Sequence, residues 1–362
     1  MTRHLLVVLL LATAAPALEG GRYLIICDDD FSPALAPLAE WKTRKGAAAR
    51  VVPLSEAGAT PAAVQDYIRD AWANWPVRPE FVLLACSPAR LPGDGFEDDC
   101  FYGDIAGDYR MEIPVGRFPA ATARECSTMV NRTLRYELAP DSADTLWLTR
   151  ATTVVCEETP PDSYYQADSR LARSYWQQHG YTLTESLANF RGHTAYHVTA
   201  ALNQGRSVIT YRGLAGGFWT DPFWQFHPYG YPWINGSRTP VFVSATCATV
   251  TVAPGEEMLG NLALRRGAPD SLHGALAFFG TTRLSNNCSR QRSTCYRGFF
   301  DAVYRDSVLN LGAATVRARN RVDSLFHEEF WYTEWCLLGD PELNLWTARP
   351  RDIEVEHDTL IL

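Results

Sequence analysis

Residues 207 to 219 read Ser-Val-Ile-Thr-Tyr-Arg-Gly-Leu-Ala-Gly-Gly-Phe-Trp. The run from Val208 to Tyr211 is β-branched or aromatic throughout, and it lacks the polar alternation of a strand with one face in water. Such a run is typical of a strand that is buried on both faces, as in a parallel sheet. A glycine-rich segment follows at once, so the sequence predicts a buried strand that ends in a tight loop.

Similar apolar runs recur along the chain, at residues 24–27, 81–86, 113–118, 153–156, 241–245 and 275–279. Amphipathic segments lie between many of them, at residues 33–46, 61–74, 122–138, 164–179, 195–204 and 256–266. Thr60 and Pro61 form a good N-cap and first helical residue, and Gly46 suits a helix C-terminus. The repeated alternation predicts a doubly wound α/β fold with mainly parallel sheets.

The composition describes a folded protein, since 46% of the 362 residues are hydrophobic and only 20% are charged. At ~100–200 residues per domain, the length predicts two core-forming units. We expect an N-terminal α/β subdomain at residues 18–140 and a second at 141–349. Residues 350–362 start a new alternating pattern, which is either a tail or the first strand of a missing β-domain.

The N-terminus has the layout of a secretory signal. A short basic start precedes the aliphatic run at residues 5–11, and Ala15-Pro16-Ala17 has the small-x-small pattern of a cleavage site. We therefore expect a signal peptide at residues 1–17 and a secreted or cell-surface protein. The apolar run is far shorter than the ~20 residues of a membrane-spanning helix, and no later segment is long enough, so no membrane span is expected.

Charge and cysteine content limit which partners and cofactors are expected. Lys and Arg number 33 against 41 Asp and Glu, a poor balance for binding nucleic-acid phosphates. The nine cysteines of an exported chain suggest disulfides, and Cys288 and Cys295, which bracket a short polar loop, are the easiest local pair. Because no cysteine or histidine cluster has zinc spacing, no required metal cofactor is expected.

Ligands of an open parallel sheet bind beyond the carboxyl ends of the strands. Cys247 stands at such an end, after the buried run at 240–246, where its thiol would be either a nucleophile or a small buried side chain. Glu157 and Glu158 end another strand at the same edge, and Trp219 belongs to an aromatic loop beside it. We expect Glu157 and Trp219 to contact substrate, with an exposed carboxylate and a cover for the sheet as the alternatives.

An acidic, glycine-containing stretch spans residues 98–108. Asp99, Asp104 and Asp108 would supply the oxygen ligands that Ca²⁺ prefers, so the stretch predicts a structural calcium site. It does not match an EF-hand loop, and a solvated acidic turn is the alternative.

Several motifs, taken in order, resemble one family. They are residues 36–42, 81–85, 99–104 and 113–117 in the first half, and 211–219, 244–247, 255–260, 280–282 and 339–346 in the second. This ordered set, from about residue 22 to 350, resembles the gingipain family of cysteine peptidases. The resemblance implies a caspase-like α/β fold with two subdomains, a protein or peptide substrate, and calcium binding in some relatives.

The resemblance also implies site residues. Cys247 falls at the family's nucleophile, and the backbone N–H groups of Gly213 and Cys247 fall at its oxyanion donors. Leu214, however, stands where the family has its catalytic histidine. Leucine can neither accept the thiol proton nor donate one to a leaving amine, and such a group contributes typically ~10²–10⁴-fold in rate.

Two functional hypotheses follow. In the first, the chain is a secreted cysteine endopeptidase with Cys247 as nucleophile and His227, in the loop between the two strands, as a substitute base. In the second, it is an inactive pseudo-peptidase that serves binding, secretion or surface assembly. A nucleotide-binding α/β protein is disfavoured, because residues 213–217 fit neither GxGxxG nor P-loop spacing.

Overall fold

The computed structural model describes residues 20–95, 97–138 and 144–350. The predicted signal peptide and nearly all of the C-terminal segment, residues 351–362, lie outside the described residues, as does the expected subdomain boundary at residue 140.

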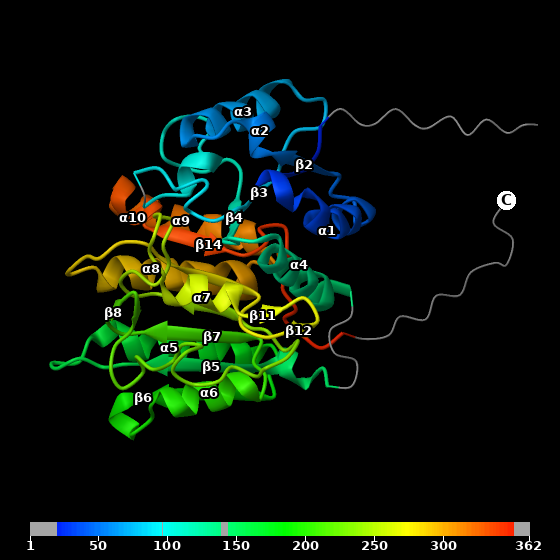
Figure 1. Cartoon of the computed structure of the whole chain (residues 1–362). Coiled ribbons are helices and arrows are strands. Elements are labelled where there is room, and N and C mark those ends of the chain that lie inside the picture. Colours follow the sequence, from blue (N-terminus) through cyan, green and yellow to red (C-terminus); the bar gives the residue numbers. More distant parts are fainter. Residues whose placement is uncertain (1–19, 96, 139–143, 351–362) are drawn as a thin grey trace, which may run out of the picture.

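A ten-stranded sheet forms the centre of the molecule, in the order β2-β1-β3-β4-β14-β13-β10-β7-β5-β6 (Figure 1). The strands are β1 Tyr23–Cys27, β2 Ala49–Pro53, β3 Phe81–Ala85, β4 Val115–Phe118, β5 Arg150–Val155, β6 Leu183–Ala188, β7 Val208–Arg212, β10 Val241–Ser244, β13 Ala277–Thr281 and β14 Trp335–Leu338. Pairing is parallel from β2 to β4 and from β13 to β6, whereas β14 runs antiparallel to β13. The predicted α/β fold with mainly parallel strands is confirmed, and one sheet runs through both halves of the chain.

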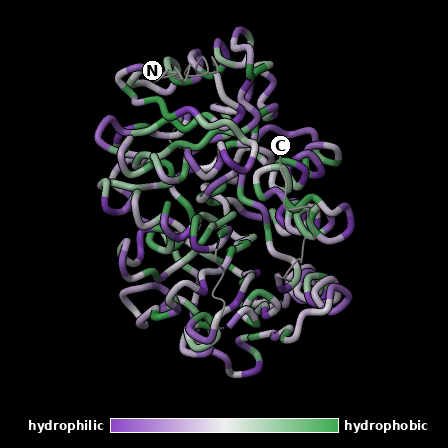
Figure 2. The backbone as a smooth tube through the Cα atoms, turned by 90° about the vertical axis from the view of Figure 1, so that its right-hand side faces the viewer, coloured by the Kyte–Doolittle hydropathy of each residue, from purple (hydrophilic) through white to green (hydrophobic). Residues whose placement is uncertain are grey.

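Helices cover both faces of this sheet. One face is covered by α1 Ser32–Arg44, α4 Ala123–Leu138, α6 Ala195–Asn203 and α7 Leu259–Arg265; the other is covered by α3 Pro61–Asn74, α5 Ser163–Gln178, α8 Ser289–Phe300, α9 Leu311–Phe326 and α10 Glu329–Thr333. Successive strand residues therefore enter different cores: Ile25 packs with the α1 side and Ile26 with the α3 side. This explains why the strand sequences show no polar alternation. Hydrophobic stretches accordingly follow inner segments of the backbone, and hydrophilic ones follow many outer turns (Figure 2).

Short elements complete the chain. They are the helix α2 Leu54–Ala57, the 3-10 turns Asp29–Phe31, Cys100–Gly103, Leu146–Thr149 and Asn189–Arg191, the π-helical turn Asp301–Arg305, and the two-residue strands β8 Ala215–Gly216, β9 Phe218–Trp219, β11 Gly267–Ala268 and β12 Ser271–Leu272. The sequence analysis missed α8 and α9 as well as β2, β6 and β14. Its polar segment between Cys288 and Cys295 is in fact the start of α8.

A buried charge network ties the last strand to the first half of the chain. The Lys42 ammonium, fully buried on α1, lies 2.9 Å from Glu137, 2.6 Å from Asp340 and 2.6 Å from Glu342. Lys45 adds contacts of 2.7 Å to Glu137 and Glu342. Burial alone would lower the pKa of Lys42, but the three carboxylates outweigh it and hold the pKa above its usual value. The residues that follow β14 are thereby fixed to α1 and α4.

We expect Lys42→Met to lower the free energy of unfolding by about 3–5 kcal/mol, because it leaves three buried carboxylates without their central cation. Lys45→Met is the matched control: Lys45 is 19% exposed and shares two of the same carboxylates, so its loss should cost clearly less. Urea unfolding of both variants measures the difference. Equal losses would contradict a central role for Lys42.

Candidate active site

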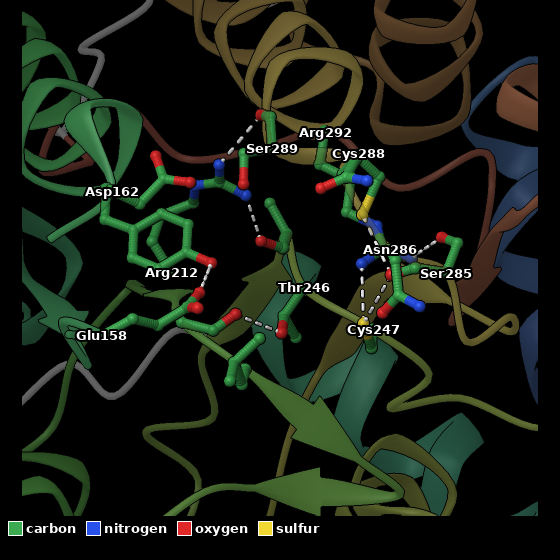
Figure 3. A pocket seen from close by; sticks show the side chains of 15 residues that line it. Glu158, Asp162, Arg212, Thr246, Cys247, Ser285, Asn286, Cys288, Ser289 and Arg292 are labelled. Atoms are coloured by element: carbon green, nitrogen blue, oxygen red, sulfur yellow. Dashed lines mark hydrogen bonds between the residues drawn. The ribbon is translucent and has the colours of Figure 1, made fainter. Parts of the chain in front are cut away.

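The carboxyl ends of β5, β7 and β10 meet at one edge of the sheet and open onto a cavity of about 520 Å³. Its lining residues are Glu158, Asp162, Tyr165, Arg212, Gly213, Leu214, Ala245, Thr246, Cys247, Ser285, Asn286, Asn287, Cys288, Ser289 and Arg292. Figure 3 shows Cys247, Cys288 and Arg292 together on one side of this cavity, and Glu158 and Arg212 on the opposite side. Cys247 therefore lies at a cavity on the carboxyl edge of the sheet, where the sequence predicted it.

The Cys247 sulfur, half-buried after β10, contacts a cation. The Arg292 Nη1 group donates to it at 2.9 Å. The sulfur also lies 3.4 Å from the Ser285 carbonyl oxygen, and the Cys288 sulfur lies 3.3 Å from that same oxygen. Two thiol groups and one guanidinium thus share a corner of the cavity.

These neighbours decide which thiol ionises. A hydrogen bond from Cys288, the charge of Arg292 and hydrogen bonds from the surroundings lower the pKa of Cys247 to about 5, although burial opposes them. The pKa of Cys288 moves the opposite way, because its proton is held against the Cys247 sulfur and because it is buried. These neighbours favour the thiolate at Cys247 and the thiol at Cys288.

Arg292 is itself firmly positioned. From α8, its Nη2 group donates to Ser285 Oγ at 2.7 Å, to Glu334 Oε2 at 3.0 Å and to the Arg283 carbonyl at 3.2 Å. Glu334 is fully buried and directly precedes β14; burial raises its pKa to about 6. Sequence reasoning missed both residues, because Arg292 lies in a polar stretch and Glu334 lies 42 positions away with no motif joining them.

The segment after β7 places Leu214 at the same cavity as Cys247, with 45% of its surface exposed. Its backbone is fixed, since the Leu214 carbonyl accepts from the Tyr211 hydroxyl at 2.8 Å and the Thr220 N–H at 3.2 Å. At Gly213 a Cβ atom would lie 2.5 Å from that hydroxyl, so no larger residue fits there. Within the described residues, no hydrogen-bond acceptor is found for the N–H groups of Gly213 and Cys247, both of which belong to residues that line the cavity.

His227 does not line this cavity. Its Nδ1 accepts from the Gly230 N–H at 3.1 Å, and its ring packs 5.1 Å from Phe218 and 5.9 Å from Trp224. Burial lowers the pKa of His227. The two cavities that Cys247 lines contain no histidine among the described residues. The base role of His227 stays a prediction, and the contacts found for it lie in its own loop.

A second cavity of about 680 Å³ adjoins the first and also includes Cys247. Trp219 borders it, but the indole is buried, stacked 4.3 Å from Tyr211, and donates to Ser244 Oγ at 3.1 Å. Glu158, not Glu157, lines the first cavity, where it accepts from Tyr165 at 2.5 Å. Substrate contacts of Glu157 and Trp219 remain untested predictions, and the geometry favours Glu158 over its neighbour.

The three carboxylates expected to bind calcium do not form one ligand set in the described part of the chain. Asp99 is paired with Arg117 at 2.6 Å and Asp108 with Arg110 at 3.0 Å. Asp104 accepts from the backbone N–H groups of residues 107–109. The one acidic triad found among described residues is Glu137, Asp340 and Glu342, which surrounds lysines.

The expected Cys288–Cys295 disulfide is wrong. All nine cysteines are free, and the two residues lie seven positions apart on α8. Two helical turns separate them by about 10 Å along the helix axis, too far for a disulfide. Cys295 is fully buried, whereas Cys288 faces the Cys247 corner of the cavity.

The mainly parallel sheet, with helices on both faces and a cysteine at a cavity on its carboxyl edge, defines an α/β protein. The model of Peptidase family C25 matches residues 17–346, and the chain belongs to this family.

Individual proteins of similar sequence are gingipains. Gingipain R2 of Porphyromonas gingivalis is 26% identical over 245 residues, which cover 63% of this chain and 32% of the relative. Lys-gingipain of the same species is 27% identical over 180 residues, covering 44% and 10%. The aligned part thus spans about a third of gingipain R2.

Solved structures show the same fold. A crystal structure of the Arg-specific cysteine proteinase gingipain R superposes with a TM-score of 0.80 at 20% identity, covering 90% of this chain and 78% of that one. The expected caspase-like architecture is confirmed. Among the described residues, no helix has both the length and the hydropathy needed to cross a membrane.

Because the pKa of Cys247 is lowered, we expect this thiol to react with an alkylating agent at a lower pH than an ordinary cysteine does. Alkylation of Cys247 by iodoacetamide, followed by peptide mass spectrometry across the pH range, should show a midpoint near the pKa of about 5. Arg292→Met removes the cation and should move the midpoint upward, toward the ~8.5 of an ordinary thiol.

Arg290→Met is the matched control, since Arg290 lies on the same helix, is exposed and packs on Phe326. It removes the same charge without touching the sulfur, so its midpoint should equal that of the unchanged protein. A wild-type midpoint near the ordinary thiol value would contradict the ionised state.

Proposed function

We propose that this chain is a cysteine-type endopeptidase that hydrolyses peptide bonds through an acyl-enzyme on Cys247. The single observation that carries the proposal is the Cys247 sulfur, which lies 2.9 Å from the Arg292 guanidinium in a cavity at the carboxyl edge of the sheet; Cys288 and Arg292 together lower its pKa. Membership of a peptidase family supports the reaction class.

The geometry suggests the first chemical step. The Cys247 thiolate attacks the scissile carbonyl carbon, a C–S bond forms, and the negative charge moves to the carbonyl oxygen. The N–H groups of Gly213 and Cys247, which have no other acceptor among described residues, would stabilise that oxygen. Collapse of this intermediate expels the leaving group, and water then hydrolyses the acyl-enzyme.

Departure of an amine requires a proton, and this step limits the proposed enzyme. Arg292 cannot supply it, because a guanidinium stays protonated at any pH that proteins experience. Leu214 occupies the cavity position where the family has its histidine. Ester and thioester substrates, whose leaving groups depart without prior protonation, should therefore react faster than amides unless His227 reaches the bound substrate.

The same residue favours a second candidate function. With Leu214 at the cavity and no histidine lining it in the described part of the chain, the site is also suited to an inactive relative that binds a peptide without cleaving it. The two candidates differ in one respect, which is whether any turnover depends on Cys247.

Kinetics of three variants distinguish them. Cys247→Ala should abolish cleavage of peptide amides and of matched thioesters. Leu214→His restores a titratable group beside the thiolate, so kcat/KM for amides should rise by about 10²–10⁴-fold, with a smaller gain for thioesters. Leu214→Asn, polar but unable to titrate, is the control and should give no such gain.

His227→Ala completes the series, since a loss of amide cleavage with thioester cleavage retained would identify His227 as the proton donor. Turnover that survives Cys247→Ala, or its complete absence in the wild type and in Leu214→His, would refute the peptidase proposal.

We further propose that the chain is exported, on the strength of the signal-like sequence at residues 1–17. Expression of the full chain in a bacterial host should yield a mature protein that begins at Leu18. N-terminal sequencing of the extracellular fraction measures this, and an intact Met1 terminus found only inside the cell would contradict it.

A further inference from the structure

A second sulfur, that of Cys288, lies in the same cavity as Cys247, and the proposed cleavage steps do not use it. Cys288 is the N-cap residue of α8, and its side chain makes no capping hydrogen bond. Its sulfur and that of Cys247 approach the same oxygen, the Ser285 carbonyl, at 3.3 and 3.4 Å. Figure 3 shows the two side chains directed toward each other across this oxygen.

The other seven cysteines are buried and do not line this cavity, although Cys156 packs behind the lining residue Gly213. Cys247 and Cys288 are the two that line it, and Cys247 also reaches the adjoining cavity. A small oxidant that enters from solvent therefore meets this pair first, and it meets the thiolate with Arg292 at hydrogen-bond distance.

We propose that Cys247 and Cys288 form a redox-sensitive pair, which a hydroperoxide converts to a reversible disulfide and a thiol reductant restores. The proposal concerns the sulfur chemistry of the cavity. Its consequence for catalysis, that oxidation would silence the nucleophile, rests on the proposed function.

The oxidation takes place in two steps. The Cys247 thiolate attacks one oxygen of the hydroperoxide, the O–O bond breaks, and the leaving oxygen takes a proton from water, which leaves Cys247 as a sulfenic acid. The Cys288 sulfur then attacks the Cys247 sulfur, an S–S bond forms, and the S–O bond breaks. The hydroxyl departs as water with the proton of Cys288. The peroxide gains two electrons, one from each cysteine.

The charges of the corner favour this order. While Cys247 is ionised, its sulfur holds the Cys288 proton in place and raises the pKa of Cys288. A sulfenic acid carries no such charge, so the first oxidation removes the anion beside Cys288 while Arg292 remains. Cys288 then ionises more easily and becomes the better nucleophile at the moment when it is needed.

To test the proposal, the full chain is treated with increasing amounts of hydrogen peroxide, and dimedone is added to trap sulfenic acid. Mass spectrometry then counts the free thiols and identifies disulfide-linked peptides. We expect the wild type to lose two free thiols, to yield a Cys247–Cys288 linked peptide, and to recover both thiols with dithiothreitol. Cys288→Ser should instead accumulate the dimedone adduct at Cys247 and, on longer exposure, the irreversible sulfinic acid.

Cys295→Ser is the matched control, since it changes a cysteine of the same helix that lies outside the cavity and should leave the linked peptide unchanged. If Cys288→Ser fails to fold by circular dichroism, Cys288→Ala and the wild-type cross-link carry the test. Oxidation of Cys247 without a linked peptide, or linkage of other cysteines first, would overturn the proposal. Because no readout is peptide cleavage, an inactive peptidase can still show the pair, and an active one can lack it.

Discussion

The structure depends on the placement of β14, a four-residue strand near the end of the described chain that enters the middle of the sheet, between β13 and β4. Both of its ends bear buried charges. Glu334, just before it, holds Arg292 at the candidate site, while Asp340 and Glu342, just after it, hold Lys42 of α1. A buried carboxylate is stable only with a partner, so each end requires a specific cation. One strand thereby joins the two halves and positions the thiolate.

The charge arrangement at Cys247 also sets the limits of its chemistry. An imidazole beside a thiol can exchange a proton, so it serves as base and then as acid. The positive charge of Arg292 favours the thiolate at Cys247, but a guanidinium keeps its own protons. Among the described residues that line the two cavities at Cys247 there is no histidine, and Leu214 lines both. In the proposed peptidase, ionisation of the sulfur is therefore separated from acid–base catalysis.

The sequence alone predicted those features that local patterns encode. Uninterrupted apolar runs such as Phe81–Ala85 identified buried strands, and a cysteine after such a run placed Cys247 at the sheet edge. It could not predict Arg292–Glu334 or Lys42–Asp340, because these pairs join residues far apart in the chain and arise only when β14 enters the sheet. The polar segment after Cys288 was misinterpreted because its arginines are typical of loops, whereas tertiary contacts of Arg292 and the buried Cys295 make it the first turns of a helix.

Leaving groups connect the two proposals. When a thiolate attacks an amide, the amine leaves only after it has gained a proton. A thiolate, an alkoxide or the leaving oxygen of a peroxide can depart without prior protonation, or can take its proton from water. A thiolate that acts without a histidine would therefore be expected to select substrates by the pKa of their leaving group. Both proposals use the contact between Arg292 and the Cys247 sulfur, in one for attack on a carbonyl carbon and in the other for attack on a peroxide oxygen. In the second, the neighbouring thiol of Cys288 would convert the oxidised product into a disulfide that a reductant can open. If both proposals hold, leucine at position 214 disfavours peptide cleavage at this cavity but leaves the sulfur chemistry of Cys247 and Cys288 unaffected.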